Sequence, residues 1–311
     1  MNRLLLVVGA VLFALGAAAL VLPDRILVER SISINRPATT VYTLLNGFSS
    51  WSEWSPWVAR DATVTVTRSG PERGPGARID WSGDPSKAGL GTQEIIASDP
   101  PRLITLTLSQ GAQGEASLQY LIDGDALGTR LTWTFEADVT SGEGVQDRLI
   151  GRFYGWFLVR WVVADFERGL ASFKAYAESL PGEDFSQAEI TRVQVAPLAV
   201  ARVTNLRAAT PEGVAEAVAD AFGAISAWAL RHDVEFQGQP FIITHHAGPG
   251  SEVYEAAVPI GRDVLAPEEG VVGYGETPSG QAACLLHRGS TLETLASYEQ
   301  LNAWVRAHGL D

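Results

Sequence analysis

Hydrophobic and polar positions divide the chain into segments of different period. Residues 4–22 carry no charge and are apolar on every helical face. Residues 116–122 and 131–136 alternate apolar and polar side chains, which is typical of antiparallel strands with one buried face. From about residue 145 to residue 180, apolar side chains return every three or four positions and predict one long helix. Strand-like runs before this helix indicate an α+β fold, with a curved antiparallel sheet packed on the helix.

The uncharged run is long enough to span a bilayer as a helix. A cleaved signal peptide is the alternative, and Ala17–Ala19 would supply its cleavage site. The apolar run continues through Leu22, which favours an uncleaved anchor. Arginines on both sides of the run give only a weak positive-inside bias. We expect residues 1–25 to anchor the chain in a bacterial inner membrane in a single pass, with the globular part on the periplasmic side.

A second pattern begins after Pro181 and Gly182. It predicts a helix over 211–231, strands over 240–246 and 253–260, a strand-like run over 273–288 and a helix over 290–308. The pair Ala-Trp precedes a histidine at the same spacing in both helices, as Trp228 with His232 and Trp304 with His308. The offset is 76 residues. This recurrence indicates an internal duplication.

Composition and charge restrict the function. The chain is 46% hydrophobic, has nine Trp, and carries a net charge of −13, of which −10 lies in residues 183–311. No cluster of Lys and Arg suits a phosphate backbone, so nucleic acid is not an expected partner. Cys284 is the sole cysteine, and His245 and His246 point to opposite faces of a strand. We therefore expect no disulfide, no metal site and no cofactor.

The stretch VERSISINRPATTVYTLLNGFSSWSEWSPW resembles the opening of the polyketide cyclase/START-like superfamily, also called SRPBCC or the birch-pollen-allergen fold. The resemblance covers residues 26–180. It implies a helix-grip fold, in which a seven-stranded antiparallel sheet holds a long C-terminal helix and leaves an apolar cavity between them. Aromatic residues of this segment are candidates for the cavity wall, with core filling as the alternative for each: Trp57, Trp81, Tyr120, Trp133 and Phe153. Residues 26–180 contain no histidine, which weakens an acid–base mechanism.

The stretches FGAISAWALRHDVEFQGQPFIITHH and GYGETPSGQAACLLHRGS resemble the gyrase-inhibitor-like family, the effector-binding domain of AraC- and MerR-type regulators. The resemblance covers residues 187–311 and implies two β-α-β-β repeats around a ligand groove. The family's last hairpin is missing, so we expect an open sheet edge, completed by a second copy in a homodimer or left by a truncated gene product. The candidate ligand contacts are Trp228, Tyr254, Glu255, Tyr274 and Trp304. Glu255 would attract a cationic, hydrophobic ligand, unless it faces solvent.

Three functions stay open at this point. The favoured one is a membrane-tethered protein that binds a small apolar or cationic molecule. The second is a hydrolase or cyclase acting on a small apolar substrate, which a convergent set of polar groups in a pocket would indicate. The third is a non-catalytic envelope scaffold, which filled cores would indicate. No catalytic residue stands out, and no DNA-binding segment accompanies the effector-binding pattern.

Overall fold

A computed structural model describes residues 21–110, 114–140, 144–207, 210–246, 252–264, 268–289 and 294–310. The proposed membrane anchor therefore lies almost entirely outside the described residues. The chain divides into two compact units, the first formed by residues up to 190 together with 285–311, and the second by 191–284.

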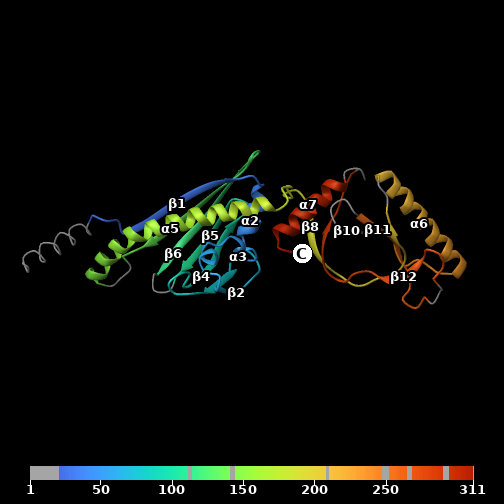
Figure 1. Ribbon diagram of the computed structural model, residues 1–311, viewed down its shortest axis with the longest axis horizontal. Coiled ribbons are helices and arrows are strands. Elements are labelled where there is room, and N and C mark those ends of the chain that lie inside the picture. The colour runs from blue at the N-terminus through green and yellow to red at the C-terminus, as the bar shows by residue number, and fades with distance from the viewer. Residues whose placement is uncertain are drawn as a thin grey trace, which may run out of the picture. The chain divides into compact units, whose positions relative to one another are not determined.

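The first unit is built on a seven-stranded antiparallel sheet with the order β1-β7-β6-β5-β4-β3-β2. Figure 1 shows the long helix α5 running along this sheet. The strands are β1 Arg25–Ile34, β2 Thr65–Ser69, β3 Arg78–Ser82, β4 Leu90–Asp99, β5 Leu103–Ser109, β6 Glu115–Asp125 and β7 Gly128–Asp138. The helices are α2 Ala38–Leu45, α3 Trp51–Trp54, α4 Pro56–Arg60 and α5 Val145–Ser179. The predicted α+β architecture, with a large antiparallel sheet and a long helix after its strands, is confirmed.

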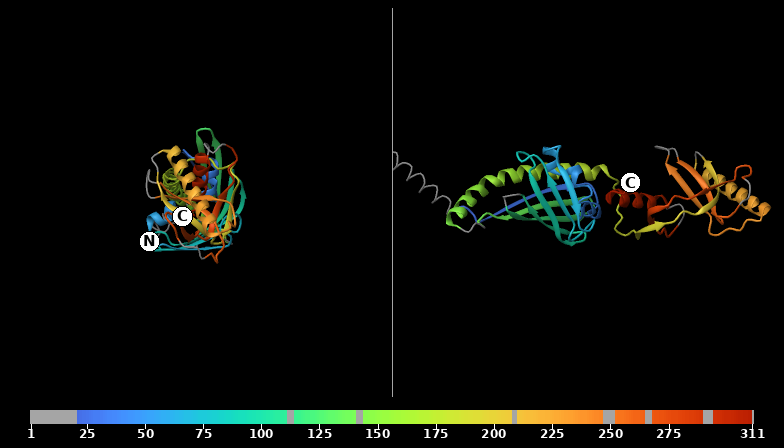
Figure 2. Two further views of the ribbon diagram at one scale, coloured as in Figure 1. Left: turned by 90° about the vertical axis from the view of Figure 1, so that its right-hand side faces the viewer. Right: turned by 90° about the horizontal axis from the view of Figure 1, so that it is seen from below.

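The alternation of apolar and polar side chains along the strands determines which face of the sheet is buried. On β6 the residues Leu118, Tyr120 and Ile122 are buried, and on β7 their neighbours are Leu131 and Trp133. These side chains form one core with the second half of α5, where the chain buries Phe166, Leu170, Phe173 and Ala177. The inner face of the sheet and this half of α5 therefore enclose the interior of the unit, and α5 covers that face (Figure 2).

The first half of α5 packs through glycines. A Cβ on Gly151 would lie 1.8 Å from the carbonyl oxygen of Val139, and a Cβ on Gly155 would lie 3.0 Å from the Ile26 side chain. Only glycine permits so close an approach of the helix to the end of β7. The apolar stripe that predicts this helix in the sequence includes Phe157 and Trp161, but these two side chains are 55% and 67% exposed.

The second unit has a four-stranded sheet in the order β10-β11-β9-β12, with helix α6 against it. Its elements are β9 Ala199–Leu206, α6 Pro211–His232, β10 Phe241–His246, β11 Glu252–Pro259 and β12 Gly273–Glu276, while β8 Ile190–Val195 pairs with β13 Gly280–Leu285. Thr210 caps α6 as predicted, since its hydroxyl accepts a hydrogen bond from the Gly213 amide at 3.2 Å. Ile225 and Trp228 are fully buried.

Within the described residues, one helical stretch is long and apolar enough to cross a membrane by length and composition alone, Gly213–His232. This stretch is most of α6, whose apolar side chains pack on the sheet of the second unit.

Helix α7, Thr294–Ala307, belongs to the first unit. Its residues Ala303 and Ala307 are buried with Phe185, and Arg73 Nη2 donates to the Ala307 carbonyl at 3.4 Å. This differs from the sequence expectation, which grouped α7 with the effector-binding domain. Leu301, Trp304 and Val305 of the helix are partly exposed, and Leu295 is exposed.

The C-termini of α6 and α7 nevertheless share one local geometry. Asp233 and Gly309 are both left-handed, with φ of 54° and 63°. The amide of the next residue bonds back five positions in each case, from Val234 to Ala229 at 2.9 Å and from Leu310 to Val305 at 3.1 Å. These positions keep the 76-residue offset of the predicted duplication.

Candidate functional site

A cavity of about 710 Å³ opens in the first unit between α5, α4 and the loop that joins β3 to β4. We call it the Trp161 pocket. Its volume suits a small organic ligand. Its lining is Arg60, Pro85, Ser86, Lys87, Ala88, Gly89, Leu90, Gln110, Leu158, Trp161, Val162, Ala164, Asp165 and Arg168. Helix α5 supplies an apolar wall, and the rim carries most of the charge.

The charges around the Trp161 pocket are predominantly positive. Asp165 is 3.0 Å from Arg60 and 2.6 Å from Arg168, so one carboxylate is shared by two guanidinium groups. Lys87 adds a third cation from the loop. The Nε of Arg60 is buried and has no hydrogen-bond partner among the described residues. An apolar molecule with an anionic group matches this lining.

The loop that forms one wall of the pocket is held by Asp61, which is 1% exposed. Its carboxylate accepts from the Thr63 hydroxyl at 2.6 Å and the Thr63 amide at 3.0 Å, and from the Asp84 amide at 2.6 Å. These bonds, the Thr63 hydroxyl first, lower the pKa of Asp61. The ionised side chain thus links the end of α4 to the β3–β4 loop by hydrogen bonds.

Replacing Asp61 with asparagine is expected to destabilise the first unit at neutral pH but not in acid. The folded pKa of Asp61 lies below its unfolded value of about 3.9, so the stabilisation is complete above that value and lost as the pH falls through the folded pKa. Melting temperatures of wild type and Asp61→Asn should therefore converge as the pH drops. Asp123→Asn, at an exposed site on β6, serves as the control and should melt with the wild type. A pH-independent difference for Asp61→Asn would contradict this role.

Four of the five aromatic residues nominated in the first unit lie in the core, and none of the five lines the Trp161 pocket. Trp57 and Trp81 have ring centroids 5.2 Å apart, and Trp133 stacks on Phe166 at 4.1 Å and contacts Tyr120 at 5.4 Å. Burial raises the pKa of Tyr120. Phe153 is partly exposed on α5.

Several polar groups in this core have no hydrogen-bond partner among the described residues. They include the indole nitrogens of Trp54, Trp57 and Trp133 and the hydroxyl of Tyr42. By contrast, Trp51 donates to Gln93 Oε1 at 3.2 Å. An unpaired buried donor costs about 1–3 kcal/mol. Donors of this kind favour a ligand or solvent with acceptor atoms reaching the interior.

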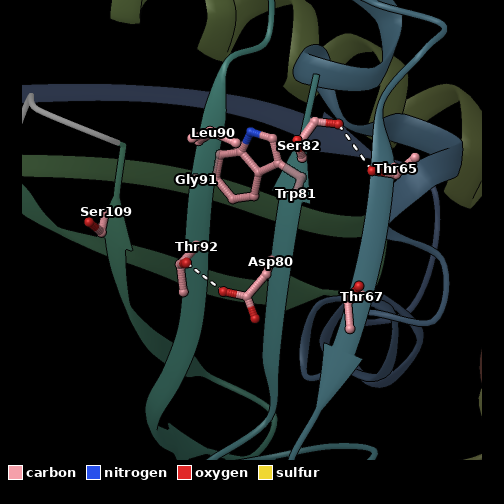
Figure 3. A pocket seen from close by; sticks show the side chains of 9 residues that line it. All are labelled: Thr65, Thr67, Asp80, Trp81, Ser82, Leu90, Gly91, Thr92 and Ser109. Carbon is pink, nitrogen blue, oxygen red and sulfur yellow. Dashed lines mark hydrogen bonds between the residues drawn. The ribbon is translucent and has the colours of Figure 1, made fainter. Parts of the chain in front are cut away.

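A second hollow, of about 390 Å³, lies on the outer face of the sheet (Figure 3). Its lining is rich in hydroxyl groups from β2, β3, β4 and β5. Thr92 donates to Asp80 at 2.6 Å, and Asp80 also bonds Arg78 at 2.8 Å. Thr65 also donates to the Ser82 carbonyl at 3.3 Å, so several polar groups of this hollow already pair with one another.

The candidates of the second domain do not form one site. Glu255 accepts from Arg202 at 3.3 Å and lies 3.1 Å from His245 Nε2, so its carboxylate already has two partners. Trp228 is in the core, in edge contact with Tyr274 at 5.6 Å. Burial raises the pKa of Tyr274. Tyr254 is partly exposed, and Trp304 belongs to the first unit, where it stacks on His308 at 3.9 Å. These contacts do not support a cationic ligand at Glu255.

No three His, Cys, Asp or Glu side chains in the described part of the chain gather closely enough to hold a metal ion. The pocket residues that the sequence analysis missed are chiefly Leu158, Val162 and Lys87. Leu158 and Val162 follow Gly151 and Gly155 by seven residues and so lie on the same side of α5, so the glycine pair signals the packed side of the helix but not the pocket.

A curved antiparallel sheet holding a long C-terminal helix defines a helix-grip domain. Residues 25–178 match a family described as "Polyketide cyclase / dehydrase and lipid transport", and they form a domain of this SRPBCC type. This agrees with the sequence resemblance for residues 26–180. No curated protein matches the chain.

The chain is also similar, at low identity, to several solved structures. The di-domain aromatase/cyclase StfQ of the steffimycin biosynthetic pathway is 20% identical, with 50% of this chain and 52% of that chain covered and a TM-score of 0.37. The Zhui aromatase/cyclase from Streptomyces sp. R1128 is 20% identical over 50% of this chain and 94% of its own, with a TM-score of 0.37. Protein SA2116 from Staphylococcus aureus, of unknown function, is 8% identical, with 50% of this chain and 97% of that chain covered and a TM-score of 0.38. The chain thus spans about half the length of StfQ.

Proposed function

We propose that this protein is tethered to a membrane and binds a small apolar molecule with an anionic group in the Trp161 pocket. One observation carries the proposal: an apolar wall on α5 faces a rim where Arg60, Lys87 and Arg168 outnumber the single carboxylate of Asp165. The family match to residues 25–178 agrees with a hydrophobic ligand.

Binding is favoured over catalysis by the same residues. The carboxylate of Asp165 is engaged by two arginines, and residues 26–180 supply no histidine as a proton carrier. A hydrolase or cyclase would need a nucleophile and a base within hydrogen-bonding reach of each other. A scaffold without a ligand would not need an open cavity of about 710 Å³.

The tether in this proposal is the uncharged run 4–22, which leads into β1. The second unit remains, in this proposal, a gyrase-inhibitor-like effector-binding domain. The shared geometry at Asp233 and Gly309 supports a duplication. The same proposal includes a single-pass location in the inner membrane, with the globular part in the periplasm. It also includes pairing with a second copy of the chain.

A photoactivatable fatty acid, added to the full chain in lipid vesicles, tests the ligand site. Cross-links mapped by mass spectrometry are expected at Leu158, Trp161 and Val162. Leu158→Trp should reduce the labelling several-fold by filling the cavity, and Lys87→Glu should reduce it by reversing a rim charge. Arg130→Glu reverses an exposed charge on β7 and serves as the control. Labelling that is unchanged in both pocket variants, or that maps elsewhere, would rule out the Trp161 pocket.

A further inference from the structure

The first half of α5 presents a continuous apolar stripe to solvent. Ile150, Tyr154, Phe157 and Trp161 follow one another at four-, three- and four-residue spacings and are 67%, 41%, 55% and 67% exposed. We call these four residues the α5 stripe. They lie along a flank of the helix, next to the side on which Gly151 and Gly155 pack on the sheet unit. Four large side chains exposed in one row mark an interaction surface.

The charge beside the α5 stripe differs from that of the rest of the chain. Residues 148–164 contain three arginines and no acidic residue, whereas the chain as a whole carries −13. Arg160 lies 5.6 Å from the ring centroid of Trp156, and Trp156 contacts Phe157 edge-on at 4.9 Å. Tryptophan, tyrosine and arginine together are the side chains that favour the boundary between lipid and water.

The same half of α5 is bound to the start of the described chain. Arg152 forms an ion pair with Asp24 at 2.5 Å, and Pro23, Gly155 and Trp156 line one small hollow. Figure 1 shows the beginning of α5 beside the beginning of β1. Pro23 directly follows the uncharged run 4–22. If that run spans a bilayer, as the proposed function holds, the α5 stripe lies at the height where the chain leaves the lipid.

We propose that the α5 stripe docks into the lipid–water interface of the membrane and forms a second contact beside the tether. The lipid interface is the favoured occupant, because the half of α5 that carries the stripe is bonded to the end of the proposed tether and contains arginines but no acidic residue. The inference rests on the proposed tether for its position, while lipid contact at the stripe is measured separately. Trp161 belongs both to the stripe and to the pocket, so docking places the pocket mouth at the membrane surface.

The test uses the full chain in vesicles of phosphatidylcholine and phosphatidylglycerol. Exposed Cys284 is replaced by serine, and a bimane dye is attached to Phe157→Cys or, as a control, to Leu121→Cys on the outer face of the sheet. Both native side chains are large, apolar and more than half exposed. Lipids carrying a spin-label quencher should quench the dye at position 157 several times more strongly than at position 121. Equal quenching at the two positions would overturn the proposal.

Two further measurements separate the alternatives. Carbonate extraction reports on the tether: a chain that resists extraction without quenching at position 157 retains the tether and refutes docking. If lipid quenches the dye at position 157 and carbonate then releases the chain, the result supports docking and refutes the tether. Pyrene at position 157 would form excimers if a second copy covered the stripe, and excimers without lipid quenching would also refute docking.

Discussion

Replacing Trp133 with alanine is expected to lower the free energy of unfolding of the first unit by about 3–5 kcal/mol. The Trp133 side chain is 1% exposed and stacks on Phe166 of α5 at 4.1 Å. It is also the side chain that a Cβ on Gly169 would approach, at 2.8 Å. Its removal leaves a cavity where the sheet and the long helix meet. Urea denaturation followed by circular dichroism measures the change.

Trp161→Ala provides the matched control for Trp133→Ala. It removes the same indole from a site that is 67% exposed, so the free energy of unfolding should change by no more than about 0.5 kcal/mol. Similar losses for the two variants would show that the core does not depend on Trp133. A folded Trp133→Ala variant that still takes up the photoactivatable fatty acid would place Trp133 in the core and outside the ligand contacts.

Replacing Gly151 with valine is expected to lower the free energy of unfolding by about 1–3 kcal/mol. The new Cβ would lie 1.8 Å from the Val139 carbonyl oxygen, so the first half of α5 would have to move away from the sheet. The photoactivatable fatty acid should then label the displaced Trp161 pocket less. Gly223→Ala on α6 is the control, because no atom lies within 4 Å of the added Cβ. Better helix propensity should stabilise that variant by up to about 1 kcal/mol. If Gly223→Ala is destabilised, helix glycines stabilise this protein for a reason other than close packing against the sheet.

The sequence predicts the elements of the first unit well because alternation and helical spacing are local properties. The buried residues on β6 and β7 are those that the period-2 pattern selects. The sequence does not predict which side of α5 packs on the sheet, because the first half of this helix is apolar on more than one side. The stripe through Phe157 and Trp161 suggests a buried face, but the close approach at Gly151 determines the packing. Hydrophobicity alone does not distinguish the two sides.

The Trp161 pocket could not be predicted for a related reason. Its rim joins Arg60 of α4, Lys87 of the β3–β4 loop and Arg168 of α5, which are far apart in sequence. Their proximity results from the sheet and from the bonds of Asp61 to the loop. The aromatic residues nominated for the cavity, apart from Phe153, fill the core themselves, and Leu158, Trp161 and Val162 of α5 supply the apolar wall of the pocket instead.

The membership of α7 in the first unit has a consequence for how the protein is made. Ala307 bonds to Arg73, so contacts of the helix-grip unit join residues more than two hundred positions apart. The ribosome releases the second unit's whole sequence before it reaches α7. Helix α7 can therefore join the N-terminal unit only after the second unit has been synthesised, and long-range contacts of this kind form late and slowly. Nascent chains stalled before residue 294 should expose the surface around Phe185 to chaperones.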